Sequence, residues 1–274
     1  MKITRADILM RVQKHYDYLV AAGYEVMVTI LQGSQNYGLD EYSKEYISDV
    51  DTKSIVLPSF NDFVENKRPV SKVEIMENNE HAEVKDIRLM LQMFKKENIS
   101  YIELLYSDYV IINPKYEKYW QELVDKRDEI VSANSLQFVK CIAGMSLEKR
   151  KALCHPYPNL IEKIEKYGYD GKQLSHCVRL WEFLFKYLIL KKPVKECFKS
   201  SMRSILMDLK KQQLNGKVLA VDDAIKMCDY YCAEIGQLKD CYSAAEKSEE
   251  RSLDGISASA ILKERFKEEL KENE

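Results

Sequence analysis

Two aspartates separated by one residue are the side chains in this sequence whose spacing most suggests chemistry. Asp49 and Asp51 flank Val50 at the start of the stretch DVDTKSIVLP. In a strand, residues i and i+2 point to one face, so the two carboxylates would lie close together while Val50 enters the core. Two like charges at that distance are unfavourable without a cation between them. The pair predicts a site for a hard divalent ion, Mg²⁺ or Mn²⁺.

A Gly-Ser pair lies upstream of these aspartates and ends the apolar segment at 25–31. Gly33 allows close backbone approach, and the Ser34 hydroxyl with adjacent amides can hold a phosphate oxygen. A phosphate turn beside a carboxylate pair suits two-metal phosphoryl transfer. The alternative is that Asp49 and Asp51 simply occupy an exposed strand edge, where acidic residues are common.

Two-metal chemistry needs a third carboxylate, and the segment HAEVKD offers two. Glu83 lies between Ala82 and Val84 in the alternating register of a strand, which makes it the preferred catalytic and metal-ligating residue. Asp86 is the fallback, because its position before a helical apolar pattern already explains it as an N-cap.

A basic stripe is expected in the second half of the chain. Lys172, His176 and Arg179 are spaced i, i+4, i+7 and share one face of a helix that Asp170 would cap. Lys and Arg there could bind the phosphates of a nucleotide, with His176 donating to phosphate or ribose. The alternative is a solvated helix face with one satisfied histidine.

Other polar and aromatic side chains have two interpretations each. The tyrosines could stack a base or pack in the core, and the lysines and arginine could neutralise phosphates or lie at the surface. These residues are Tyr37, Tyr42, Tyr46, Lys53, Lys85, Lys149, Arg150 and Lys151.

The elements that would position these groups change character along the chain. A capping box at Thr4 starts a helix that Gly23 ends, and strands follow at 25–31, after Asp49, and in a hairpin at 72–76 and 81–85. Beyond Asp86 the apolar period is helical, with helices expected near 86–96, 116–131, 135–153, 171–191, 196–213 and 219–247. The predicted class is α+β: a small mixed sheet with flanking helices at 1–115, an all-α domain at 116–250 and a charged terminal helix at 251–274.

Composition excludes some functional classes. The formal net charge of −2 gives no global signal for a nucleic-acid or anionic-membrane surface. No segment approaches the about 18 to 20 uncharged apolar residues that cross a bilayer, so a cytoplasmic protein without a membrane partner is expected.

The cysteines number seven, an odd count that favours reduced thiols. Cys228 and Cys232 share a helical face and could hold half of a zinc site. No second pair or nearby histidine in the sequence completes it, so packed thiols are the simpler expectation.

The ordered trio of Gly33-Ser34, Asp49-Val50-Asp51 and a later strand carboxylate resembles the nucleotidyltransferase superfamily that includes DNA polymerase β. The forms GSQNYGL and SDVD are similar to its bacterial and phage branch, some of which is linked to RNA repair. The similarity continues through Asn98, Glu103 and Leu104 to the segment YGYDGKQLSHCVRLWEFL, and covers most of 29–190. Departures are the long spacer after Ser34 and a glutamate where an aspartate is expected.

The resemblance implies transfer of a nucleoside monophosphate from a triphosphate, ATP by default, with release of pyrophosphate. Asp49 and Asp51 would bind the metals, Glu83 would help the catalytic one, Gly33 and Ser34 would hold the triphosphate, and Lys172, His176 and Arg179 would contact the nucleotide across the cleft. The acceptor could be an RNA end, a protein hydroxyl or a small alcohol. The alternative is a catalytically silent nucleotide sensor or a toxin-antitoxin-type interaction protein.

Overall fold

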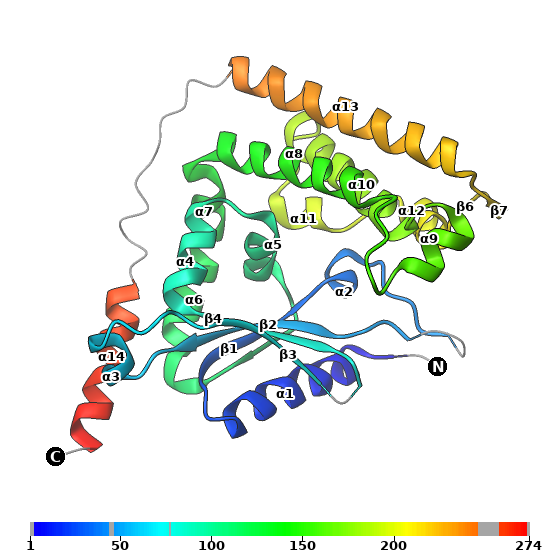
Figure 1. The fold of residues 1–274 in the computed structure, drawn as a ribbon. Helices are drawn as coiled ribbons and strands as arrows, with labels where there is room; N and C mark the ends of the chain where they lie inside the picture. Colours follow the sequence, from blue (N-terminus) through cyan, green and yellow to red (C-terminus); the bar gives the residue numbers. More distant parts are fainter. Residues whose placement is uncertain (1–2, 44–46, 77, 246–257, 273–274) are drawn as a thin grey trace. The chain divides into compact units, whose positions relative to one another are not determined.

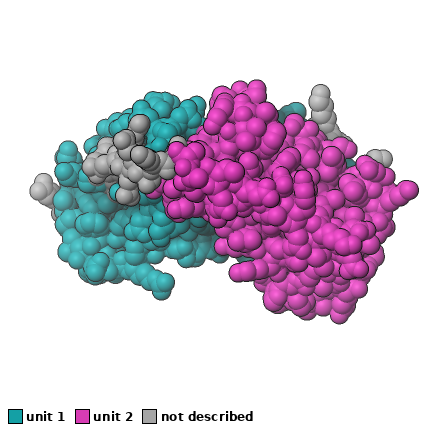
Figure 2. Space-filling view, turned by 90° about the horizontal axis from the view of Figure 1, so that it is seen from above, with its two compact units in different colours: residues 1–36, 40–133, 250–274 teal, residues 37–39, 134–249 magenta. Residues whose placement is uncertain are grey.

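The protein, analysed as a computed structural model, is described at residues 3–43, 47–76, 78–245 and 258–272. It divides into two compact units, coloured separately in Figure 2. The first comprises 1–36, 40–133 and 250–274, and the second comprises 37–39 and 134–249. Strands of a mixed sheet lie in the first and the second is mostly helical, which confirms the predicted α+β class.

A five-stranded sheet forms the centre of the first unit, in the order β3-β4-β2-β1-β5. The strands are β1 (Glu25–Gln32), β2 (Asp51–Leu57), β3 (Ser71–Ile75), β4 (His81–Asp86) and β5 (Val110–Ile112). β2 and β4 are parallel and the other neighbours are antiparallel, so the sheet is mixed as predicted. β5 was not predicted, because three apolar residues are too short to give a periodic signal.

Helices cover both faces of this sheet, with α1 (Arg5–Ala21) on one and α4 (Ile87–Lys95) and α5 (Ile99–Ile102) on the other (Figure 1). The capping box predicted at Thr4 is present, with Asp7 completing it. The apolar side of α1 is buried against β1 and the segment leading into β2. Asp86 caps α4, as its position predicted. Two shorter helices are α3 (Phe60–Val64) of this unit and α2 (Ser34–Tyr37), whose last residue belongs to the second unit.

The boundary expected near residue 115 lies later, because the compact first unit continues to residue 133. The expected helix at 116–131 is two helices, α6 (Glu117–Asp125) and α7 (Arg127–Ala133). Two contacts tie α7 to Tyr106: the Tyr106 hydroxyl donates to Asp128 at 2.6 Å, and the Arg127 guanidinium lies over the Tyr106 ring. Trp120 is buried with them.

The charged terminal helix, α14 (Ala258–Glu272), packs on its own chain in the first unit. Phe266 contacts the rings of Phe60 and Phe63 on α3, and the Phe60 amide donates to Glu269 at 3.1 Å. The expected polar linker at 247–255 lies outside the described residues.

Six helices and a short hairpin make up the described part of the second unit. They are α8 (Ser135–Ala152), α9 (Ile161–Tyr167), α10 (Gly171–Leu184), α11 (Val194–Phe198), α12 (Arg203–Lys210), α13 (Val221–Ala245), β6 (Gln213–Leu214) and β7 (Lys217–Val218). α10 is central and contacts α8, α12 and α13. It passes into a π-helical turn at Phe185–Ile189, where the sequence predicted continuous α-helix.

A close approach of α10 to α12 explains a glycine at the start of the basic helix. A Cβ built on Gly171 would collide with the Leu209 carbonyl oxygen, so only glycine fits there. Among the described helices, no single one is long and apolar enough to cross a membrane, although the consecutive helices α7 and α8 reach that length and composition when taken together.

Candidate functional site

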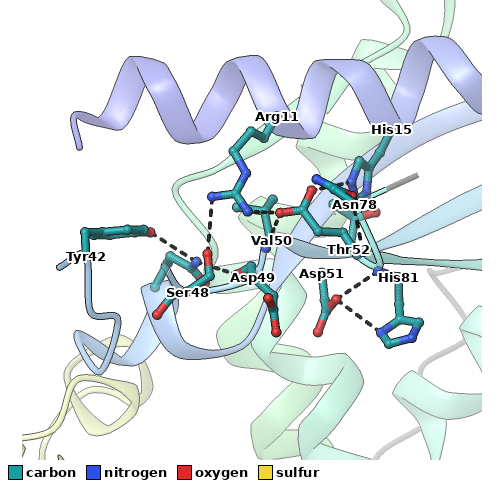
Figure 3. A network of polar contacts seen from close by, with 12 residues as sticks. Arg11, His15, Tyr42, Ser48, Asp49, Val50, Asp51, Thr52, Asn78 and His81 are labelled. Carbon is teal, nitrogen blue, oxygen red and sulfur yellow. Dashed lines mark hydrogen bonds and ion pairs between the residues drawn. The ribbon is translucent and has the colours of Figure 1, made fainter. Parts of the chain in front are cut away.

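The predicted carboxylate pair lies at the edge of the sheet where β1 ends and β2 begins. Gln32, the last residue of β1, pairs in register with Asp51, the first residue of β2. Asp49 precedes the ladder, and Figure 3 shows its carboxylate pointing to the same side as that of Asp51. Asp49 is exposed, Asp51 is half-buried and Val50 is buried between them. The sheet therefore presents two neighbouring carboxylates to solvent.

The Gly-Ser turn lies at the same edge, because it follows β1 directly. Gly33 has φ +105°, in the region that glycine adopts without strain. Ser34 is half-buried, and its hydroxyl donates to Gln35 Oε1 at 3.3 Å. The Gln35 amide in turn donates to the Asp49 carbonyl at 2.7 Å. One side chain thus ties the turn to the carboxylate pair.

A buried glutamate that the sequence analysis missed holds the pair from behind. Glu80 is 2% exposed, and its Oε1 accepts a hydrogen bond from the Val50 amide at 2.9 Å. The same carboxylate forms an ion pair with Arg11 of α1. Arg11 also donates to the Ser48 carbonyl at 3.2 Å (Figure 3). Backbone groups on both sides of Asp49 are therefore fixed by one ion pair.

A histidine from α1 completes this network. His15 Nε2 lies 3.1 Å from Glu80 Oε2, and its Nδ1 lies 2.9 Å from the hydroxyl of Thr52. Burial lowers the pKa of His15 to about 4, with Asp51 opposing and Arg11 reinforcing the shift. The ring is neutral near pH 7, so its N–H donates to Glu80 and its other nitrogen accepts from Thr52.

Asp51 also contacts the start of the neighbouring strand β4. The His81 amide donates to Asp51 Oδ1 at 2.9 Å, and His81 Nδ1 lies 3.4 Å from the same oxygen (Figure 3). The Asp51 side chain remains about one-third exposed. An exposed imidazole is therefore the nearest titratable neighbour of Asp51 on this strand.

Glu83, the preferred third carboxylate, lies on the same face of the sheet but is held by cations. It pairs in register with Lys53, and its oxygens lie 2.8 Å from Lys53 Nζ and 3.0 Å from Lys85 Nζ. The Tyr101 hydroxyl donates to it at 2.9 Å. Burial acts to raise the pKa of Glu83, but the two lysines and Tyr101 outweigh it and lower that pKa. Its charge is already compensated.

The fallback residue, Asp86, is also occupied. It is buried, caps α4 through the Arg88 amide at 2.8 Å, and accepts two further bonds from the Arg88 guanidinium at 2.9 and 2.7 Å. Such a bidentate pair together with a cap accounts for the residue as a structural group.

The donor set at the edge suits a hard cation held by two carboxylates. Mg²⁺ commonly takes one or two carboxylates and completes its shell with water and substrate phosphates. Within the described part of the chain, no set of three ligand atoms from His, Cys, Asp or Glu that includes Asp49 and Asp51 lies within 4.8 Å of one another. An ion held there by Asp49 and Asp51 would therefore take its remaining ligands from water or substrate.

The predicted basic stripe forms a cluster on α10 in the second unit. Asp170 caps the helix, accepting from the Lys172 amide at 3.1 Å, as expected. Lys172 is exposed, His176 is half-buried and Arg179 is buried, with its guanidinium 3.7 Å from the centre of the Tyr37 ring. In the described residues, Arg179 Nε has no hydrogen-bond partner. Tyr37 thus stacks on the arginine.

Lys149 of α8 joins this cluster and shows how strongly positive it is. Burial lowers the pKa of Lys149, and Arg179 and Lys172 lower it further against the opposing effect of Glu148. Burial and the same cations, together with Lys149 itself, hold the pKa of His176 well below its usual value. No described carboxylate forms an ion pair with Lys149 or Lys172. Together with Arg179, we call these residues the basic cluster.

Most of the remaining predicted residues have structural partners, and Lys151 of α8 is exposed. Lys53 and Lys85 pair with Glu83, and the Tyr42 hydroxyl accepts from Gln35 at 3.2 Å. Arg150 pairs with Asp229 at 2.5 Å. Tyr46 lies outside the described residues.

Comparisons with known proteins give little beyond this. No family model matches the chain, and no curated protein matches it. A nucleotidyltransferase-like protein from Exiguobacterium sibiricum is similar in structure at a TM-score of 0.29 and 10% sequence identity, over 84% of this chain and 74% of that one. At that score the likeness supports no conclusion about function.

Proposed function

We propose that this protein is a metal-dependent nucleotidyltransferase, which transfers a nucleoside monophosphate from a triphosphate to an acceptor hydroxyl. ATP is the default donor, and the resemblance of the sequence motifs favours an RNA end as acceptor. The observation that carries the proposal is the juxtaposition of Asp49 and Asp51 with the Gly33 turn, fixed by the pairing of Gln32 with Asp51.

The residues of the sheet edge take distinct roles in this proposal. Asp49 and Asp51 would hold Mg²⁺, which would supply charge neutralisation for the triphosphate. The Gly33 backbone and the Ser34 hydroxyl would bind phosphate oxygens. The acceptor oxygen bonds to the α-phosphorus, the bond to the bridging oxygen breaks and pyrophosphate leaves. The acceptor proton passes to an exposed carboxylate or to water.

The basic cluster supports the same function by its charge. Lys149, Lys172 and Arg179 bring positive charge together where no described carboxylate pairs with Lys149 or Lys172, which is unfavourable unless an anion binds. Lysine and arginine are the side chains that bind phosphate oxygens most strongly. We assign this cluster to phosphate binding.

The test is release of pyrophosphate from each labelled nucleoside triphosphate with Mg²⁺, in the presence and absence of RNA. The proposal expects release with at least one nucleotide, its loss on adding a chelator, and its loss in Asp51→Asn. Asp240→Asn, which changes an exposed aspartate of α13, is the matched control and should keep activity. Labelled product that migrates with RNA would identify the acceptor.

A second candidate is a nucleotide-binding sensor or interaction protein without turnover. It is favoured by one specific observation: both candidate third carboxylates, Glu83 and Asp86, are already neutralised by cationic side chains. This candidate expects triphosphate binding with no pyrophosphate release in any condition, and that result would overturn the enzyme.

A further inference from the structure

Three cysteines from two helices meet inside the second unit, away from the residues discussed so far. Cys177 lies on α10, and Cys228 and Cys232 lie one turn apart on α13. Their sulfur atoms all lie within 4.8 Å of one another, and those of Cys177 and Cys232 are 3.5 Å apart. The sequence showed the pair on α13, but Cys177 reaches it only through the packing of α10 on α13.

The separation of the sulfurs matches what one metal ion requires. Sulfurs bound to zinc lie about 2.3 Å from the ion, so two in tetrahedral directions lie about 3.8 Å apart. The 3.5 Å between the sulfurs of Cys177 and Cys232 is close to that value, and all three sulfurs lie within 4.8 Å of one another. Three thiolates are also the ligand type that selects soft ions such as Cu⁺ and Zn²⁺ over Mg²⁺ or Ca²⁺.

The surroundings of the cluster suit thiolates and give an ion access. Cys177 and Cys228 are buried while Cys232 is partly exposed, which leaves one side open. Cys232 therefore offers the most accessible of the three sulfurs to an incoming ion. The positive charge of Arg150 also acts on Cys228. In the described residues, no His, Asp or Glu ligand atom joins the three sulfurs.

We infer that Cys177, Cys228 and Cys232 form a binding site for one thiophilic d¹⁰ metal ion, Zn²⁺ or Cu⁺, with any fourth position filled from solvent. Each S–H bond breaks as a sulfur–metal bond forms, and the proton passes to the buffer. No oxidant or reductant is consumed. The site lies within the helical unit and is independent of the proposed nucleotidyl transfer.

The experiment uses the full chain, reduced and freed of metal. Titration with Co²⁺ should give one ion per chain and a thiolate-to-cobalt charge-transfer band, and Zn²⁺ should displace it. Cu⁺ binding is measured separately by competition with a chelator that gives a coloured cuprous complex. Zinc-edge X-ray absorption of the wild-type protein should show three sulfur neighbours at about 2.3 Å. An oxygen- and nitrogen-only shell would overturn the inference.

Variants separate the cluster from other thiols. Cys177→Ser and Cys232→Ser should each lower Zn²⁺ affinity by at least about 100-fold, because three-ligand closure is lost. Cys197→Ser changes a buried thiol of the same unit whose partner is the Lys192 carbonyl, and it should bind as wild type does. Circular dichroism checks that each variant folds. If the variants do not fold, the X-ray absorption spectrum of the wild-type protein tests whether three sulfurs bind the ion. A wild-type protein that binds no ion at micromolar metal overturns the proposed site.

Discussion

The two aspartates at the sheet edge and the basic cluster on α8 and α10 are opposite in charge and alike in one respect. In each, like charges are gathered without enough described counter-charges to balance them. Other carboxylates in the protein form ion pairs. Glu83 pairs with two lysines, Asp86 with Arg88 in a bidentate arrangement, and Glu80 with Arg11. Uncompensated groups cost stability and so mark places where a ligand brings the missing charge. Groups whose charge is balanced by an ion pair instead stabilise the fold.

Breaking the network of Glu80, Arg11 and His15 behind the aspartates should cause the largest loss of stability. Glu80→Ala leaves Arg11 without its partner and the Val50 amide without its acceptor, so the free energy of unfolding should fall by about 3 to 5 kcal/mol. Urea denaturation followed by circular dichroism measures this. Glu122→Ala, which removes an exposed ion pair with Lys126, is the control and should change stability by less than about 1 kcal/mol. Equal losses in the two variants would show that the network is not structural.

Removing an uncompensated carboxylate should lower activity without lowering stability. Asp49→Asn and Asp51→Asn should each lower kcat/KM by at least about 100-fold, since each removes one of the two proposed metal ligands. Stability should stay the same or rise, because a repulsion between like charges is relieved. Thermal unfolding and nucleotide turnover are measured on the same samples. A loss of stability of the size expected for Glu80→Ala would contradict the distinction between the two kinds of site.

The pH dependence of stability gives a test within the compensated network. The folded pKa of His15, about 4, lies below its unfolded value near 6.5. The unfolded chain therefore takes up a proton first as pH falls, and stability that is complete above about pH 6.5 declines by about 2 kcal/mol between pH 6.5 and 5. His15→Gln keeps a donor and an acceptor and should remove that slope. An unchanged slope in His15→Gln would assign it to other groups.

Glu83 is compensated by two lysines although the sequence predicted it as a metal ligand, so its substitution tests the distinction. Because Glu83 forms ion pairs with Lys53 and Lys85, Glu83→Gln should lower the free energy of unfolding by about 1 to 2 kcal/mol. Affinity for Mn²⁺, followed by paramagnetic relaxation of water, should then change by less than about twofold. A tenfold loss of Mn²⁺ affinity would instead restore Glu83 as the third metal ligand.

The sequence identified the local features well, because they depend on spacing along the chain. The capping box at Thr4, the neighbouring carboxylates of Asp49 and Asp51 and the cap at Asp86 all follow from periods of two or 3.6 residues. They needed no knowledge of which strands pair.

Features that depend on long-range packing could not be read in this way. Glu80 lies in a polar turn, and only the approach of α1 buries it against Arg11 and His15. The register of β2 with β4 decides that Glu83 faces Lys53. Cys177 joins Cys228 across 51 residues. In each case the missing information is which element packs on which.

The smallest loss of function is expected at the basic cluster, because several cations there would bind the same phosphates. Lys172→Ala removes an exposed charge while leaving Lys149 and Arg179, so affinity for a nucleoside triphosphate should fall by about tenfold, equivalent to about 1.4 kcal/mol. The loss should shrink as salt rises, because a phosphate contact is screened. Lys226→Ala, an exposed lysine of α13 paired with Asp223, is the control for a general loss of positive charge. Isothermal titration at two salt concentrations measures both. Since a solvated helix face predicts equal, negligible effects of the two substitutions, a difference between them separates a phosphate site from a surface.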